Sequence, residues 1–412
     1  MGLKMYMLDT TILSEEGQLL VWCARTSFSG STQDKIRERV KGGIDWNAFT
    51  GLARWHGVVP LVYRSLLASC PEFLPDPIRS DLKQYVGATC VLNSVLADEL
   101  VQLVSRLASR GVQAIPFKGP VLSLMAYKNL GLRECDDLDL IVKREAIAQA
   151  CMILSEMGYE VVASTTEGKL AKGEERLYNV FRKHNGVVRV DLQWTMAHTR
   201  FSFVLDRPVM WSRLIPVALP RGTVRSFPPE ELLAVLCVHG TKHVWELLRW
   251  VCDIAELLHT YPSMDWDKVD DLVSDWRCRR SVRLGLFLAQ RLFGVDLQEK
   301  MQRDIIKDAD VLRLGMLMPA SLLKSPEMGI SEQHADAVYL SLKESWTARA
   351  RFALVLIHES SPSLATPLPW FRQQASLILL HAILCPVLKA LVKAADFVGV
   401  RKKLARWLTQ YE

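Results

Sequence analysis

The sequence predicts an α+β fold, in which a small mixed-sheet core at about residues 111–195 is embedded between helical regions. Apolar residues recur at three- and four-residue spacing up to residue 110, which is typical of amphipathic helices. From residue 111 short apolar runs alternate with helical segments, and from residue 228 the helical spacing returns. We therefore expect four regions: N-terminal helices over 1–110, an α/β core over 111–227, helices over 228–300 and further helices over 301–412.

The helical pattern of the N-terminal region is clearest in segments 47–67 and 85–111. Gly111 follows the last periodic residue of the second segment, and a glycine at this place commonly ends a helix.

The core is expected to contain its elements in the order strand, helix, strand, helix, strand, strand. The first strand, 112–117, leads into the turn Lys118-Gly119-Pro120. The last two strands are joined by Asn185-Gly186, the strongest short hairpin signal in the chain. The remaining expected elements are a helix at 121–130, a strand at 138–142, a helix at 144–160 closed by Gly158, and hairpin strands at 178–184 and 186–194.

The region after the core is expected to be helical again. Segment 229–259 begins with proline and two acidic residues, as helix N-termini do, and is long enough for two helices. Segment 375–392 is nearly apolar, and we interpret it as a buried C-terminal helix broken at Pro386. The alternative is a contact with a membrane surface, in which the following basic residues face lipid headgroups. Those residues are Lys393, Arg401, Lys402, Lys403 and Arg406.

Composition and charge predict a folded protein, which we expect in the cytoplasm or bound peripherally to the membrane. Half of the residues are apolar and 23% are charged, and the net charge of +6 is compatible with anionic substrates without being a nucleic-acid signature. The nine cysteines are scattered, without a C-x-x-C pair, which favours reduced thiols over a disulfide framework or a zinc site.

Two aspartates alternate directly at a predicted buried strand. Asp137 and Asp139 should project from the same face of strand 138–142, about 7 Å apart along it. Hard divalent cations prefer such oxygen ligands. A lone D-x-D also occurs by chance as a structural or solvated feature. Whether this one binds metal must therefore be judged from the residues around it. Asp136, the acid before the pair, is interpreted as a solvated flank or as support for the other two.

Three neighbours favour a site for metal and phosphate. Asp191 is a single acid in the apolar strand 186–194, which could lie beside the D-x-D strand and complete a triad. The turn Lys118-Gly119 could hold phosphate with its amides and ammonium, and the guanidinium of Arg133 could take a phosphate oxygen. Metal-bridged carboxylates beside a phosphate cradle are the parts of phosphoryl or nucleotidyl transfer.

These motifs resemble the core of the bacterial nucleotidyltransferase-like family of the polymerase β superfamily. The likeness covers roughly residues 15–260 and follows the family's order of motifs. Two positions depart from that pattern, because Pro120 follows Gly119 where a serine is usual and Gln193 stands where the family has histidine. The matching motifs are Lys118-Gly119, Tyr127, Arg133, Asp137 with Asp139, Gly158-Tyr159, Asp191-Leu192-Gln193-Trp194 and the helical segment 239–257.

The resemblance implies a Mg²⁺-dependent nucleotidyltransferase with an NTP as substrate. Asp137 and Asp139 would hold two Mg²⁺ ions, and Asp191 would bind the catalytic metal and help deprotonate the acceptor. The acceptor would be a hydroxyl or phosphate of a small molecule, sugar or peptide, and pyrophosphate would leave. One alternative is a toxin-like enzyme that adds nucleotides to tRNA. Another is a non-catalytic scaffold or nucleotide-binding protein that kept the fold.

His239, Lys242 and His243 are expected to contact substrate or phosphate from the helices after the core. Ordinary helix packing and a zinc pair are the alternatives, although H-x-x-x-H lacks the glutamate of the zincin motif and a clear third ligand.

Four further features of this region have structural interpretations. Trp245 and Trp250 are expected in the core instead of forming a platform for a base. Arg249 and Asp253 are expected to form an ion pair along the helix, one turn apart. The basic run 277–283 is interpreted as a solvated helix face, with RNA contact as the alternative.

Overall fold

The structure is a computed structural model that describes residues 8, 13–163, 178–183, 186–194, 208–323, 332–350 and 352. The chain divides into two compact units, Met1–Glu344 and Ser345–Glu412. The first unit contains all the helices and strands discussed below. The apolar segment 375–392 and its basic residues lie outside the described residues, as does Asn185 of the predicted hairpin turn. The division into four regions stays a prediction.

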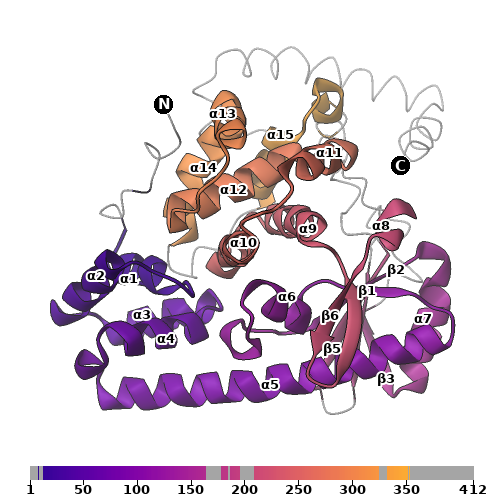
Figure 1. The fold of residues 1–412 in the computed structure, drawn as a ribbon, viewed down its shortest axis with the longest axis horizontal. Helices are drawn as coiled ribbons and strands as arrows, with labels where there is room; N and C mark the ends of the chain where they lie inside the picture. The colour runs from indigo at the N-terminus through magenta and orange to yellow at the C-terminus, as the bar shows by residue number, and fades with distance from the viewer. Residues whose placement is uncertain are drawn as a thin grey trace, which may run out of the picture. The chain divides into compact units, whose positions relative to one another are not determined.

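The N-terminal part of the first unit is helical, as predicted (Figure 1). Ser14, Ser29 and Asp45 each accept a backbone N–H at a helix N-terminus, which satisfies donors that a helix leaves unpaired. The elements are α1 (Glu15–Cys23), α2 (Gly30–Lys41), α3 (Trp46–Trp55), α4 (Val59–Ser69), the short 3₁₀ helix η3 (Pro71–Phe73) and α5 (Asp76–Ser109).

The long helix α5 supports the rest of the unit by packing against α4, α6, α7 and β1. Its inward positions, among them Leu96, Leu100 and Leu103, are fully buried. Gly111 follows the helix with φ +78°, a conformation open to glycine without strain, so the predicted stop is confirmed. By length and mean hydropathy (1.2), α5 is the one described helix that could also cross a membrane, a test that core helices pass as well.

The core is a five-stranded mixed sheet in the order β1-β2-β5-β4-β3. β2 pairs with β5 in parallel, and the other neighbours are antiparallel. The predicted α+β fold with a mixed sheet is therefore confirmed. The strands are β1 (Ala114–Pro116), β2 (Leu138–Val142), β3 (Tyr159–Ala163), β4 (Tyr178–Lys183) and β5 (Arg189–Gln193).

The segments between the strands are helical. The predicted helix at 121–130 is shorter than expected and is followed by a separate 3₁₀ turn, and the helix at 144–160 ends earlier. Tyr159 and Glu160 belong to β3, an edge strand that the sequence analysis assigned to the preceding helix. These elements are α6 (Gly119–Ala126), η4 (Leu130–Leu132), η5 (Arg144–Ala146) and α7 (Ile147–Glu156).

The predicted hairpin is confirmed as the antiparallel pair β4–β5. β5 then lies directly beside β2, with Asp191 paired to Asp139 in the register. Leu138 and Leu140 alternate with the acids and are buried, so the apolar face of β2 fixes which way the acids point.

A second hairpin and further helices complete the described chain. The hairpin of β6 (Ile215–Leu219) and β7 (Gly222–Ser226) was not predicted, whereas the division of 229–259 into two helices is confirmed. The helices are α8 (Pro208–Ser212), α9 (Pro229–Lys242), α10 (Leu248–Thr260), α11 (Trp266–Asp275), α12 (Arg279–Phe293), α13 (Glu299–Lys307), α14 (Ala309–Leu322) and α15 (Glu332–Leu342).

The turn between α9 and α10 is tight and strained. Trp245 donates its N–H to the carbonyl of Gly240 (2.8 Å), and Val244 donates to Thr241 (3.0 Å), the hydrogen bonds of a Schellman motif. Val244 has φ +53° at the position that usually holds glycine, which is a rare conformation for a β-branched residue. The ring of Trp245 packs on Gly240 and is only 1% exposed, which confirms its predicted place in the core.

Because of this packing, Gly240→Ala should destabilise the protein by about 1–3 kcal/mol. A Cβ at position 240 would lie 2.6 Å from a ring carbon of Trp245, which forces the buried ring to move. Gly87→Ala is the matched control, because Gly87 is exposed within α5 and its Cβ would meet nothing within 4 Å. The control should gain about 0.5–1 kcal/mol from helix propensity. Urea unfolding measures the change in unfolding free energy of both variants. Equal changes in the two would contradict the packing argument.

Candidate active site

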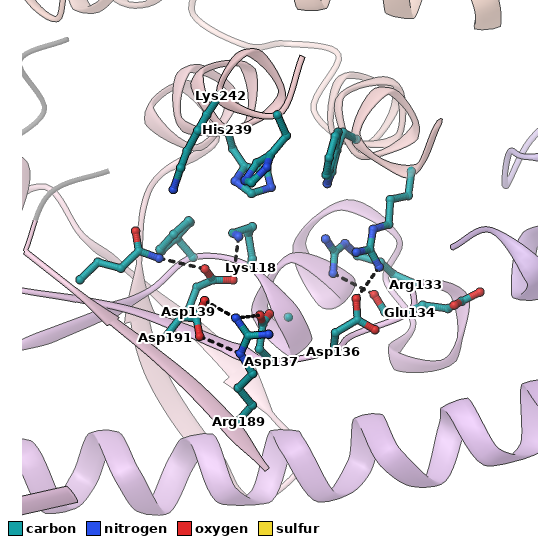
Figure 2. A pocket seen from close by; sticks show the side chains of 16 residues that line it. Lys118, Arg133, Glu134, Asp136, Asp137, Asp139, Arg189, Asp191, His239 and Lys242 are labelled. Carbon is teal, nitrogen blue, oxygen red and sulfur yellow. Dashed lines mark hydrogen bonds and ion pairs between the residues drawn. The ribbon is translucent and has the colours of Figure 1, made fainter. Parts of the chain in front are cut away.

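A cavity of about 240 Å³ lies where the sheet meets α9 and α10 (Figure 2). Its walls come from the turn before α6, the loop before β2, the strands β2 and β5, and the two helices. All nine residues predicted to act in a site line this one cavity: Lys118, Gly119, Arg133, Asp137, Asp139, Asp191, His239, Lys242 and His243.

The three aspartates come together because β2 and β5 are parallel neighbours. Asp139 and Asp191 are directly opposite in the register, which places side chains about 5 Å apart. Asp137 lies two residues before Asp139, so it projects to the same side. The predicted triad of acids is therefore present as a geometric arrangement, and its binding of metal stays a prediction.

Asp139 is the most enclosed of the three acids, with its side chain 3% exposed. The ammonium of Lys118 lies 2.8 Å from its Oδ2, and the amide of Gln193 donates to its Oδ1 over 3.0 Å. Gln193, which departs from the family pattern, therefore still holds this carboxylate in place.

Arg189 is a cavity residue that the sequence analysis missed. Its guanidinium donates two hydrogen bonds to the two oxygens of Asp191, at 3.0 and 3.1 Å, and lies 4.0 Å from Asp137 (Figure 2). The alternation of the segment Arg189-Val190-Asp191 was the available signal, because residues two apart on a strand share a face.

The acids raise one another's proton affinity. Burial, and next the charge of Asp139, raise the pKa of Asp137 to about 7. Burial and the same neighbour also raise the pKa of Asp191. Ionising these carboxylates together is therefore costly in the metal-free cavity, and a bound divalent cation would favour their ionised form by supplying opposite charge.

The donor set fits Mg²⁺, since carboxylate oxygens from two adjacent strands converge on one cavity. Within the described residues, however, no three acidic, histidine or cysteine side chains already stand at ligand distances. The ion pairs of Lys118 and Arg189 explain this, because they draw Asp139 and Asp191 toward cations of the chain itself.

In the turn after β1 the backbone of Gly119 lies close to the backbone of the loop before β2. Gly119 has φ +55°, and a Cβ there would lie 3.1 Å from the carbonyl oxygen of Asp137. Pro120 occupies the first turn of α6, where its fixed φ suits the helix. It removes one amide donor from the expected phosphate cradle.

His239, Lys242 and His243 line the opposite wall, which is formed by the C-terminal turn of α9. The ring centroids of the two histidines lie 4.7 Å apart, and each lies 5.2–5.4 Å from the ring centroid of Trp250. Burial lowers the pKa of His243 to about 3 and also lowers that of His239, so both imidazoles are neutral. Trp250 is buried, as predicted, but forms part of the cavity wall.

Arg133 is held by a buried ion pair. Its guanidinium donates to both oxygens of Asp253, at 2.8 and 3.0 Å, and Tyr127 donates to the same carboxylate over 2.8 Å. The predicted pair of Arg249 with Asp253 is therefore wrong, because Asp253 faces Arg133 and Arg249 instead contacts Asp136 (2.7 Å). Phosphate binding by Arg133 stays a prediction.

The basic run 277–283 is not simply a solvated face. Arg280 contacts Asp308 and Asp310 at 2.9 and 3.0 Å, and Arg283 contacts Asp304 at 2.8 Å. These pairs join α12 to the segments of α13 and α14, so the two arginines act in packing.

The chain is similar to known proteins over much of its length. The profile of a family described as "uncharacterised nucleotidyltransferase" matches residues 42–294. Among solved structures, the solution structure of the antibiotic-resistance factor ANT(2'')-Ia matches with 14% identity and a TM-score of 0.31, over 45% of this chain and 94% of that chain. No curated protein matches the chain in sequence.

Asp253→Asn should cost about 3–5 kcal/mol of unfolding free energy, because it leaves the buried Arg133 without its counter-charge. Asp136→Asn is the matched control, since Asp136 pairs with Arg249 and its side chain is 61% exposed. That variant should lose only about 0–1 kcal/mol. Guanidinium unfolding of both proteins measures the difference, and comparable losses would refute the assignment of the buried pair.

Asp137 should make the metal-free protein less stable as the pH rises from about 4 to 7. The folded protein retains a proton on Asp137 up to a pKa of about 7, whereas an unfolded chain releases it near the ordinary value of 3.8. Asp137→Asn lacks this penalty, so it should exceed the wild type by about 1–3 kcal/mol at pH 8 and match it near pH 4. Urea unfolding in EDTA across this range is the measurement; parallel pH profiles would contradict the prediction.

Proposed function

The chain belongs to the family of uncharacterised nucleotidyltransferases and is a transferase, and we propose that it moves a nucleoside monophosphate from an NTP to an acceptor hydroxyl or phosphate. Pyrophosphate would be the second product. The proposed cofactor is Mg²⁺, as a two-metal site.

The observation that carries this proposal is the pairing of Asp139 with Asp191 on adjacent parallel strands, with Asp137 beside them. Two strands hold three carboxylates rigidly on one side of a cavity whose other wall carries cations. Preorganised charge of this kind is what phosphoryl and nucleotidyl transfer require, because the protein's main contribution is to position groups and neutralise charge.

Each wall of the cavity has its own part in the proposal. Asp137 and Asp139 would hold Mg²⁺, and Asp191 would hold the catalytic metal and accept the proton of the acceptor hydroxyl. Bound Mg²⁺ would supply charge neutralisation at the phosphates and activation of the acceptor. Lys118 and Lys242 approach from opposite walls, and burial followed by the charge of Lys118 lowers the pKa of Lys242. Two neighbouring ammonium groups suit a phosphate chain between them.

His239 and His243 are proposed to contact the substrate as neutral imidazoles. Each neutral ring offers one donor and one acceptor, which fits hydroxyl and phosphate oxygens as well as base edges. Their contact with Trp250 keeps both rings fixed at the cavity wall.

The proposed acceptor is a group on a small molecule, sugar or peptide. The cavity lining mixes equal numbers of basic and acidic side chains, whereas a tRNA acceptor would require a predominantly basic surface. The basic members are Lys118, Arg133, Arg189, Lys242 and Arg249, and the acidic ones are Glu134, Asp136, Asp137, Asp139 and Asp191. A cytoplasmic location is proposed as well, and no disulfide joins the described cysteines.

Calorimetric titration with each of the four NTPs, with and without Mg²⁺, tests the proposal without knowledge of the acceptor. At least one NTP should bind the wild-type protein in a Mg²⁺-dependent manner. The double variant Asp137→Asn/Asp139→Asn should bind at least about tenfold more weakly, a loss of about 1.4 kcal/mol.

Asp81→Asn is the control for this titration, because it removes an exposed acid that pairs with Arg54 and lies outside the cavity lining. It should bind the NTP as the wild type does. If no NTP binds the folded wild-type protein, the catalytic proposal fails and the non-catalytic scaffold becomes the better account.

A further inference from the structure

The three aspartates of the cavity are already matched by cations of the chain itself. Lys118 lies against Asp139, while Arg189 binds Asp191 through two hydrogen bonds and approaches Asp137 to 4.0 Å (Figure 2). One guanidinium thus contacts two of the three acids. A cation at this position competes with any divalent ion for the same carboxylate oxygens.

The position of Arg189 follows from the strand that carries it. β5 places Arg189 and Asp191 two residues apart on the same face, and a planar guanidinium matches the two oxygens of one carboxylate. The Arg189 side chain is 39% exposed and lines the cavity. It can therefore rotate toward a ligand without breaking the packing of the sheet, whereas the buried Arg133 cannot.

We propose that Arg189 is a resident cation that couples the binding of metal to the binding of nucleotide, an inference that rests on the proposed function. In the ligand-free site Arg189 pairs with Asp191 and lies near Asp137, which lowers the affinity of these acids for a divalent ion alone. When metal and nucleotide enter together, Arg189 leaves the carboxylates and donates its two parallel N–H groups to a phosphate, an anion of similar geometry.

The exchange leaves each charged group of the site with a partner of opposite charge. The carboxylates lose the arginine and gain the divalent ion, and the guanidinium loses a carboxylate and gains a phosphate oxygen. Neither group is left buried without a counter-charge at the end, which would be costly. Binding of either ligand then strengthens binding of the other by the same factor.

Arg189→Gln tests this coupling directly in binding, without a reaction. At pH 8 we would titrate Mn²⁺ alone, and then ATP, GTP, CTP and UTP in turn with saturating Mg²⁺, by calorimetry. The variant should bind Mn²⁺ alone about tenfold more tightly than the wild type, because a charge-assisted bidentate pair no longer competes. It should bind the Mg²⁺–nucleotide more weakly, because the phosphate contact is lost.

Arg182→Gln is the matched control. Arg182 is the cross-strand partner of Arg189 on β4, is exposed, and lies outside the cavity lining. It removes the same charge from the same hairpin, so its Mn²⁺ affinity should stay close to that of the wild type. An equal gain in Mn²⁺ affinity in both variants would mean that only the loss of a positive charge matters, which would overturn the proposal.

Two results separate this inference from the proposed function. If the wild type binds a Mg²⁺–nucleotide but Arg189→Gln leaves the Mn²⁺ affinity unchanged, the coupling role is wrong and the proposed function stands. If neither Mn²⁺ nor any Mg²⁺–nucleotide binds the wild type, both fail. Should Arg189→Gln not fold, Arg189→Lys replaces it, since it keeps the charge but loses the paired hydrogen bonds. That variant should gain about threefold in Mn²⁺ affinity, and no gain would overturn the inference.

Discussion

The register between the parallel strands β2 and β5 is the constraint on which the rest of the site depends. It is fixed by apolar burial: Leu138, Leu140, Val190 and Leu192 are at most 1% exposed. Burying each such side chain contributes about 1.5–3 kcal/mol, so a slip by one residue, which turns every side chain to the other face, is strongly disfavoured. The hydrophobic core therefore determines where the charges lie, although no apolar residue of these strands touches the cavity.

The buried pair of Arg133 and Asp253 joins the two halves of the cavity. Arg133 belongs to the loop before β2, and Asp253 lies in α10, which also carries Arg249 and Trp250. Both partners are almost completely enclosed, and Tyr127 completes the carboxylate's hydrogen bonds. A pair of this kind adds little net stability compared with apolar residues, but it tolerates only one arrangement of the two elements. It thereby holds the loop that leads into β2 against α10.

Sequence reasoning was most successful where local pattern and function coincide. The strand of Asp139, the hairpin with Asp191 and the two helices over 229–259 each have a clear periodicity, and all the predicted site residues line one cavity. Contacts between distant segments leave no such local signal. The pairing of Asp253 with Arg133 therefore displaced the expected contact with Arg249. Arg189 did have a local signal, its two-residue spacing from Asp191, and was overlooked because an arginine in a strand does not by itself indicate a site. The strand β3 was missed because Tyr159 and Glu160 were assigned to the end of the preceding helical segment.

The separation of 120 residues between Arg133 and Asp253 also has a consequence for synthesis on the ribosome. At about 5–20 residues per second, α10 emerges roughly 6–24 s after the loop that it must cover. During this interval the sheet can pair its strands, since β1 to β5 are complete by residue 193. The guanidinium of Arg133 and the apolar surface of α6, however, stay in contact with water until the partner helix arrives. The nascent chain thus carries an unfinished face for several seconds, which makes this interval the point at which assistance by a chaperone would matter most.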